Sequence, residues 1–355
     1  MTFERQVMFW VAALVVLLGA LWLLADILLP FVAGMALAYL LDPIARLAGR
    51  LGIGRAASAL IVITLVIVVL VVVAMLVAPV LSHQLTAFVD NLPGYLTRLQ
   101  SLVADPSRPW LSKIFGERLS DGGSSLGGLA AQGSGWIATF LGSLWTGGRA
   151  VFSVLSLLVI TPVVAFYLLC DWDRLLATVD GWLPRPYRDT ICGLAREIDS
   201  AIAGFVRGQA VICVILAVFY AIGLTLTGLN FGFLIGLMTG FISFIPFVGA
   251  LTGFLIAGIV AIAQFWPNMT PILLVVGVFV VGQGLEGYVL SPKLVGARVG
   301  LHPVWLIFAL LAFGYLFGFL GLLVAIPLAA AVGVLARFAL RKYMASSIYT
   351  GDGAR

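Results

Sequence analysis

Glu286 is the residue whose type and position most directly suggest chemistry. It is the only acidic residue between Asp199 and Asp352, and it lies in an apolar run that is otherwise uncharged, 271–290. A charge at the centre of a membrane helix costs about 2.5–3.5 kcal/mol on insertion scales, so such residues usually serve a function. A carboxylate at a cavity could bind a proton or Na⁺, or hydrogen-bond a polar solute. The alternative is an interface residue that pairs with Lys293 or Arg298.

Further polar groups could form a pocket with this carboxylate. Gln283 precedes Glu286 by three residues and shares its helix face. Backbone groups freed at a helix break can coordinate a solute only where protein or water covers them. The expected binding residues for a substrate or ion are Glu286, Gln283, Ser243, Thr239, Pro246, Gly249, Phe319 and Gly321.

The composition excludes a soluble globular enzyme. Of 355 residues, 62% are hydrophobic and 10% charged, against about 45–50% and about 25% in soluble domains. The net charge of +5 comes with basic residues near the ends of apolar runs, a pattern of membrane topology rather than nucleic-acid binding. Two histidines and three cysteines show no metal or redox spacing, and no phosphate-binding loop is present. We expect no catalysis, no metal and no cofactor, apart from a coupling ion, H⁺ or Na⁺.

Two apolar runs are too long for one membrane crossing. Each has 33 residues without a formal charge, 231–263 and 304–336, which as helix would be about 50 Å long against a hydrocarbon core of about 30 Å. Helix breakers lie in the middle of both. They predict broken helices or re-entrant hairpins, although full crossing of each run stays open. The breakers are Pro246 and Gly249 in the first run and Gly318, Gly321 and Pro327 in the second.

The distribution of basic residues predicts the orientation. Arg46, Arg50 and Arg55 place the loop between the apolar runs 27–41 and 56–81 in the cytoplasm, together with the N-terminus. With hairpins, Lys293 and Arg298 also lie inside, as does the C-terminal end with Arg337, Arg341 and Lys342. A spanning helix followed by a hairpin then occurs twice, and the two copies enter the membrane from opposite sides. Such an inverted repeat is typical of secondary transporters, although channels also use re-entrant segments.

The predicted fold class is an all-α polytopic membrane protein divided into seven segments. Helices 1–3 occupy 1–81 and helix 4 occupies 150–170. Between them, 82–149 is an extracytoplasmic amphipathic helix, interrupted at Pro93-Gly94, followed by a Gly/Ser-rich loop. A cytoplasmic amphipathic linker, 171–204, precedes the first repeat, 205–263, the second repeat, 271–340, and a cytoplasmic tail, 341–355.

Short motifs follow one another along nearly the whole chain. They are AYLLDP at 38–43, FYLL at 166–169, DWDR at 171–174, VRGQ at 206–209, FIPFVG at 244–249, Gln283 with Glu286, SPKLVG at 291–296, LHP at 301–303 and LFGFLG at 316–321. In their order and spacing, the chain resembles the AI-2E family of membrane transporters. Two positions depart from the family pattern: Ala250-Leu251 stands where relatives often have a proline, and Gly287 where they often have asparagine.

The resemblance implies about eight membrane segments, a homo-oligomer and transport of small solutes. Family members have been linked to export of autoinducer-2 and, in other branches, to Na⁺(Li⁺)/H⁺ antiport. We therefore expect a secondary transporter in the bacterial inner membrane that exports a small polar solute by alternating access, with lipids and the solute or ion as its partners. The alternatives are a cation/proton antiporter and, from another class, a non-transporting scaffold or a passive channel.

Overall fold

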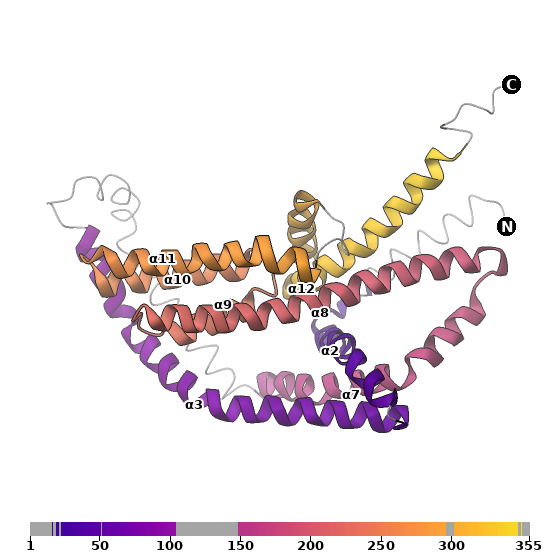
Figure 1. Cartoon of the computed structure of the whole chain (residues 1–355), viewed down its shortest axis with the longest axis horizontal. Coiled ribbons are helices and arrows are strands. Elements are labelled where there is room, and N and C mark those ends of the chain that lie inside the picture. The colour runs from indigo at the N-terminus through magenta and orange to yellow at the C-terminus, as the bar shows by residue number, and fades with distance from the viewer. Residues whose placement is uncertain are drawn as a thin grey trace. The chain divides into compact units, whose positions relative to one another are not determined.

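The computed structural model describes residues 16, 19–20, 23–50, 52–103, 148–295, 302–346 and 349. Within these ranges every regular element is a helix (Figure 1). The first of the three helices predicted in 1–81, the Gly/Ser-rich loop that ends the segment 82–149, and Arg298 lie wholly or largely outside the described residues. The helices are α2 (Ala25–Arg50), α3 (Arg55–Val103), α7 (Gly148–Trp182), η2 (Arg185–Tyr187), α8 (Arg188–Leu226), α9 (Gly232–Ile242), α10 (Val248–Phe265), α11 (Met269–Gly284), the π-helix η3 (Leu285–Val295) and α12 (Pro303–Met344).

Six helices of the described part are long and apolar enough to span a membrane, so the protein is a multi-pass α-helical membrane protein. The helix of the fourth predicted pass, α7, is not among the six, and α9 is apolar but has only 11 residues. The expected number of about eight segments therefore stays a prediction. The six are Ile27–Arg50, Arg55–Asn91, Arg185–Leu226, Val248–Phe265, Met269–Val295 and Val304–Met344.

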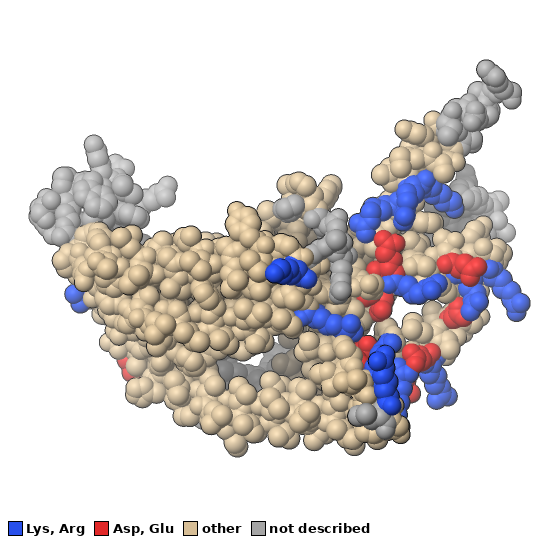
Figure 2. Space-filling model, in the orientation of Figure 1, with Lys and Arg blue, Asp and Glu red and all other residues tan. Residues whose placement is uncertain are grey.

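The chain divides into two compact units. Unit 1 comprises Met1–Thr64, Ser156–Gln209 and Pro292–Arg355. Unit 2 comprises Leu65–Leu155 and Ala210–Ser291. Figure 2 shows hardly any charged side chains over α9, α10 and α11, whereas Lys, Arg, Asp and Glu gather over elements of unit 1.

In unit 1, α2 and α7 approach each other closely. A Cβ atom on Gly34 would lie 2.8 Å from the Val164 side chain and 2.9 Å from the Thr161 carbonyl oxygen. The Thr161 hydroxyl donates to the Pro30 carbonyl of α2 at 3.3 Å. Arg55, at the start of α3, donates to the Leu169 carbonyl and pairs with Asp173 of α7. These contacts connect α7 with α2 and with the start of α3.

The chain of unit 1 turns between α7 and α8, outside the apolar runs. Arg188 forms an ion pair with Asp180 and Cys192 donates to the same carboxylate. The hydrogen bonds from Arg188 and then Cys192 lower the pKa of Asp180 below its ordinary value. The carboxylate therefore stays ionised and closes the turn.

In unit 2, four antiparallel segments are packed through glycines. Gly232, Gly236 and Gly240 recur every fourth residue on α9 and face Leu224, Ala221 and Ala217 of α8 in reverse order. Glycines at this spacing allow membrane helices to approach backbone to backbone. On the other side, Gly282 of α11 lies against the Tyr220 ring, and Phe254 of α10 meets Phe279 of α11 edge to face at 5.4 Å. Figure 1 shows α9, α10 and α11 running alongside one another.

The predicted break in the first long run is confirmed. Helix α9 ends at Ile242 and α10 begins at Val248, with Phe247 between them at a φ of 68°. Cβ atoms on Gly253 and Gly249 would collide with Thr239 and Ser243 respectively, so the two helices fold back on each other as a hairpin.

The second long run also breaks where predicted. Within α12, Gly318 has a φ of 60° and a ψ of −137°, which interrupts the helix. A Cβ atom on Gly321 would lie 1.8 Å from the Phe313 carbonyl oxygen, and one on Gly314 would lie 2.8 Å from the Leu322 side chain. Residues eight apart therefore meet across the bend, whereas Pro327 is accommodated inside the following helical half.

The outer amphipathic segment differs from the prediction in one respect. Helix α3 continues unbroken from Arg55 to Val103 and contains both Pro79 and Pro93, so the predicted interruption at Pro93-Gly94 is absent. Contacts within unit 2 hold this extension: Gln84 accepts from the Leu234 amide at 3.0 Å, and Phe88 meets Phe231 edge to face. Tertiary packing thus outweighs the hydrogen bond that a proline removes from a helix.

Replacing Gly240 by alanine tests the packing of α9 on α8. The added methyl group would lie 2.2 Å from the Ala217 backbone, and overpacking of this kind costs about 1–3 kcal/mol. We expect a lower free energy of unfolding in detergent titration followed by circular dichroism. Gly258→Ala is the matched control, because nothing lies within 4 Å of its Cβ position; equal stability of both variants would contradict the close approach.

Candidate functional site

The residues predicted to form one pocket belong to both units. Thr239, Ser243, Pro246, Gly249, Gln283 and Glu286 are in unit 2, whereas Phe319 and Gly321 are in unit 1. Phe319 and Gly321 follow the bend at Gly318, where the Phe319 side chain is exposed and Gly321 packs against Phe313.

The two hydroxyl groups of α9 are used within the hairpin. Thr239 and Ser243 are only 1% and 2% exposed. The Thr239 hydroxyl donates to the Ile235 carbonyl at 2.7 Å, and the Ser243 hydroxyl donates to the Thr239 carbonyl at 2.8 Å. Bonds of this type satisfy a polar side chain on its own helix. A solute could therefore use only the remaining acceptor capacity of these oxygens.

The backbone at the hairpin tip is largely paired through short turns. The amides of Phe244 and Ile245 donate to carbonyls three residues earlier, and the Val248 amide donates to the Ile245 carbonyl. Pro246 is half-buried, whereas Gly249 is buried against Ser243. The tip is thus a compact turn in which Gly249 provides close packing.

Glu286 and Gln283 lie together, as their spacing predicts. The Gln283 Nε2 donates to Glu286 Oε2 at 3.1 Å. Glu286 is half-buried, lies in the first turn of the π-helix η3, and interacts electrostatically with the Tyr220 hydroxyl and the Cys213 thiol. Within the described part of the chain, no basic side chain lies within ion-pair distance of this carboxylate. The π-helix is a rare element that often occurs at functional sites.

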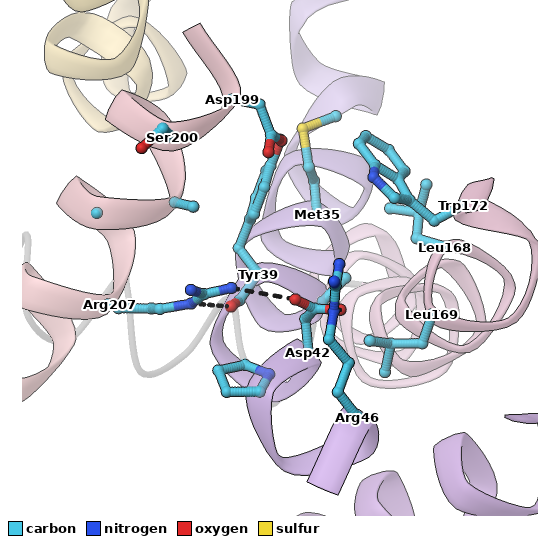
Figure 3. A pocket seen from close by; sticks show the side chains of 14 residues that line it. Met35, Tyr39, Asp42, Arg46, Leu168, Leu169, Trp172, Asp199, Ser200 and Arg207 are labelled. Carbon is cyan, nitrogen blue, oxygen red and sulfur yellow. Dashed lines mark hydrogen bonds and ion pairs between the residues drawn. The ribbon is translucent and has the colours of Figure 1, made fainter. Parts of the chain in front are cut away.

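A second polar site, in unit 1, was not predicted. It is a pocket of about 490 Å³, which is within the size range of small-molecule sites. Its wall comes from α2, α7 and α8 (Figure 3). The lining residues are Met35, Ala38, Tyr39, Asp42, Pro43, Arg46, Leu168, Leu169, Trp172, Asp199, Ser200, Ala203, Gly204 and Arg207.

One end of this pocket is organised around Asp42. Arg207 of α8 donates from Nε to the Tyr39 carbonyl at 2.7 Å and from an Nη atom to Asp42 Oδ2 at 3.2 Å. Arg46, one turn after Asp42 on α2, donates from Nε to Asp42 Oδ1 at 2.8 Å. The Asp42 side chain is 25% exposed, and its carboxylate pairs with both guanidinium groups. Figure 3 shows these three side chains converging.

The other end contains Asp199 and two aromatic rings. The Tyr39 hydroxyl donates to Asp199 Oδ1 at 2.8 Å. The Trp172 indole meets the Tyr39 ring edge to face, with centroids 6.2 Å apart. Ser200 lines the pocket next to Asp199. Tyr39 therefore connects both ends, through its carbonyl to Arg207 and through its hydroxyl to Asp199.

The sequence contained a signal for this pocket. Four of the motifs that carry the family resemblance, 38–43, 166–169, 171–174 and 206–209, supply most of its polar and aromatic wall. Asp199 lies outside these motifs, and only the packing of α8 on α2 reveals its role. The sequence pointed to Glu286 instead, because this acidic residue lies in an otherwise uncharged apolar run.

Comparison with known proteins decides the family. Residues 11–341 match the family described as AI-2E family transporter. The chain belongs to this family. Because its members are transport proteins and permeases, the expectation of a membrane transport protein rather than an enzyme is confirmed.

Two relatives show how far the similarity extends. The Bacillus subtilis (strain 168) protein named "Putative transport protein YueF" is 28% identical over 313 residues, covering 87% of this chain and 83% of that protein. The Escherichia coli (strain K12) protein named "Putative permease PerM" is 28% identical over 324 residues, covering 90% of each. The similarity thus includes both units and both candidate sites.

A double-mutant cycle on Asp42 and Arg207 tests the ion pair of the pocket. We expect a coupling energy of about 1 kcal/mol between Asp42→Ala and Arg207→Ala, because partly exposed pairs contribute about 0.2–1 kcal/mol and this one shares a hydrogen-bond network. The measurement is the free energy of unfolding in detergent. Arg55 and Asp173, a more exposed pair, provide the comparison, and zero coupling for Asp42 and Arg207 would contradict the network.

Proposed function

We propose that the protein is a secondary transporter that exports a small polar solute across the bacterial inner membrane. The observation that supports this most directly is the pocket of about 490 Å³ with ionised and aromatic side chains on its wall. Such a mixed wall can fix the orientation of a small solute through a few polar groups while apolar surface covers the rest of it.

The position of the pocket along α2 supports loading from the cytoplasm. Asp42 and Arg46 lie in the last turns of α2, just before Arg50 and Arg55. Positive-inside counting places this end of α2, and both chain termini, in the cytoplasm. A solute-binding site near the cytoplasmic surface is the arrangement that an exporter needs for uptake of its substrate.

The two helix breaks support alternating access through an inverted repeat. Helix α9 has 11 residues and would be about 16 Å long, so it cannot cross a hydrocarbon core of about 30 Å. We therefore propose re-entry of the α9–α10 hairpin and, by analogy, of the two halves of α12 that meet at Gly318. The breaks would act as gates on opposite sides of the membrane.

Autoinducer-2 is the candidate solute that the family description suggests. The proposed partners are membrane lipids and other copies of the chain. Large apolar side chains are exposed along α3, including Leu65, Leu70 and Met75, and such a surface needs lipid or another subunit to cover it.

Efflux from proteoliposomes tests the proposal, with labelled autoinducer-2 as the first probe. We expect saturable release that falls at least about tenfold in Arg207→Gln, since a charged hydrogen bond contributes about 1.5–3 kcal/mol. Glu197→Gln is the control, because Glu197 pairs with Arg337 and does not line the pocket.

Other outcomes of this experiment separate the alternatives. Release that rises linearly with concentration and is independent of counter-ions would identify a passive channel. Release equal to that of protein-free liposomes would exclude autoinducer-2 as the substrate, and an Arg207→Gln rate equal to the wild-type rate would exclude the pocket.

A second candidate function, Na⁺(Li⁺)/H⁺ antiport, rests on Glu286. This half-buried carboxylate hydrogen-bonds Gln283 and has no basic partner within the described residues. A carboxylate in this setting can exchange a proton for a cation. The same residue would serve as the coupling group if the solute moves against an ion gradient.

Internal pH in proteoliposomes tests the role of Glu286. Addition of Na⁺ should drive proton movement in the wild-type protein, and Glu286→Gln should abolish it because the amide cannot titrate. Glu197→Gln again serves as the control. A flat trace in the wild type would exclude antiport, whereas altered assembly of Glu286→Gln with unchanged solute flux would favour a scaffold.

A further inference from the structure

The formal charges on the wall of the unit 1 pocket sum to zero, but the positive and negative charges lie at opposite ends. Four lining side chains carry a formal charge: Asp42, Asp199, Arg46 and Arg207. Both arginines pair with Asp42, so that end of the pocket keeps one positive charge. Asp199 at the other end has no basic side chain within ion-pair distance among the described residues, and it keeps one negative charge.

The positive end has hydrogen-bond donors to spare. A guanidinium group has five N–H donors. The bonds of Arg207 use two of them, on the Tyr39 carbonyl and Asp42, and the bond of Arg46 uses one. The remaining donors of two guanidinium groups on one wall suit a carboxylate or a similar anionic group.

The negative end suits a donor group. Asp199 accepts one hydrogen bond from Tyr39 through Oδ1, and an ionised carboxylate has acceptor capacity beyond this bond. The Trp172 ring lines the same pocket, and aromatic faces attract ammonium groups. An amine at this end would meet one negative charge and an aromatic wall.

The distance between the ends is set by one residue. Tyr39 contacts Arg207 through its backbone carbonyl and Asp199 through its phenolic hydroxyl. The two charged ends are thus separated by about the length of a tyrosine side chain, because one contacts its backbone carbonyl and the other its hydroxyl. Figure 3 shows Asp199 and Arg207 at opposite ends of Tyr39. A short carbon chain with charged groups at its ends matches this arrangement better than an α-amino acid.

We propose that this pocket binds a small zwitterionic solute, with its anionic group at Arg46 and Arg207 and its amine at Asp199. This inference rests on the proposed function insofar as it names the substrate class of the transporter, and it favours a zwitterion over the neutral, hydroxylated autoinducer-2 as the solute of this pocket. A simple anion would leave Asp199 unpaired, and a simple cation would leave the excess positive charge of the arginines unpaired. Only a solute with both charges compensates the two ends together.

Isothermal titration of the purified full-length protein in detergent tests this with four probes that share a four-carbon chain. They are γ-aminobutyrate, butyrate, butylamine and 1,4-butanediol. We expect γ-aminobutyrate to bind about tenfold or more tightly than each of the others, since one charged hydrogen bond contributes about 1.5–3 kcal/mol and about 1.4 kcal/mol is tenfold in affinity.

Two variants assign the ends. Asp199→Asn should reduce the affinity for γ-aminobutyrate to that for butyrate and leave butyrate binding unchanged. Arg46→Gln should weaken γ-aminobutyrate and butyrate while leaving butylamine unchanged. Glu197→Gln, two residues before Asp199, should bind all four probes as the wild type does, and the thermal unfolding midpoint of each variant monitors its fold.

Four results would overturn the proposal. Tightest binding of butyrate would indicate an anion site, tightest binding of butylamine a cation site, and tightest binding of the diol a site for neutral hydroxylated solutes. Equal or absent binding of all four probes would show that the pocket is only a structural ion-pair network.

Transport is measured separately, as efflux of labelled γ-aminobutyrate from proteoliposomes. Selective binding without efflux would contradict the transporter and retain the zwitterion site. Efflux of another solute without selective binding of γ-aminobutyrate would retain the transporter and contradict the site.

Discussion

A membrane interior offers no water to backbone amides and carbonyls, and this constraint underlies most of the structure. Each unpaired group would cost several kcal/mol, so the described chain is helical, and the two breaks inside its long apolar runs are closely packed. At the tip after α9, short turns pair the amides and Gly249 packs on Ser243. At Gly318, the bend brings Gly321 onto the Phe313 carbonyl.

The same constraint limits where charge can lie. In the membrane-spanning segments, ionised side chains are affordable near the ends, where water and partners are available. Asp42, Arg46 and Arg207 are therefore grouped at the end of α2 and on α8, in a shared network. Glu286 is the exception, because its described contact is the neutral amide of Gln283. The two sites thus present different chemistry: a paired, polar recognition surface and a single carboxylate.

The features that depend on local sequence could be predicted. Pro246 and Gly318 break helices for reasons that lie within a few residues, and the spacing of Gln283 and Glu286 is enough to bring them together. Family membership also followed from the order of short motifs.

The pocket of unit 1 could not be placed in this way, because Tyr39 and Asp199 are 160 residues apart and no periodicity in the sequence indicates that α8 packs on α2. The packing of the glycines at 232, 236 and 240 on α8 depends on tertiary structure in the same way. Pro93 shows the opposite error, since a local signal for interruption was outweighed by packing of the α3 extension.

The cancelling charges of the unit 1 pocket also affect how fast a solute can arrive. A site with a large net charge attracts oppositely charged ligands over a Debye length, and its association rate then falls with ionic strength. Separated but equal charges produce a field that fades within a short distance, so encounter with this pocket is governed by ordinary diffusion. Discrimination among solutes must then reside in how long each one is retained, and changes in salt concentration should have little influence on the rate of entry.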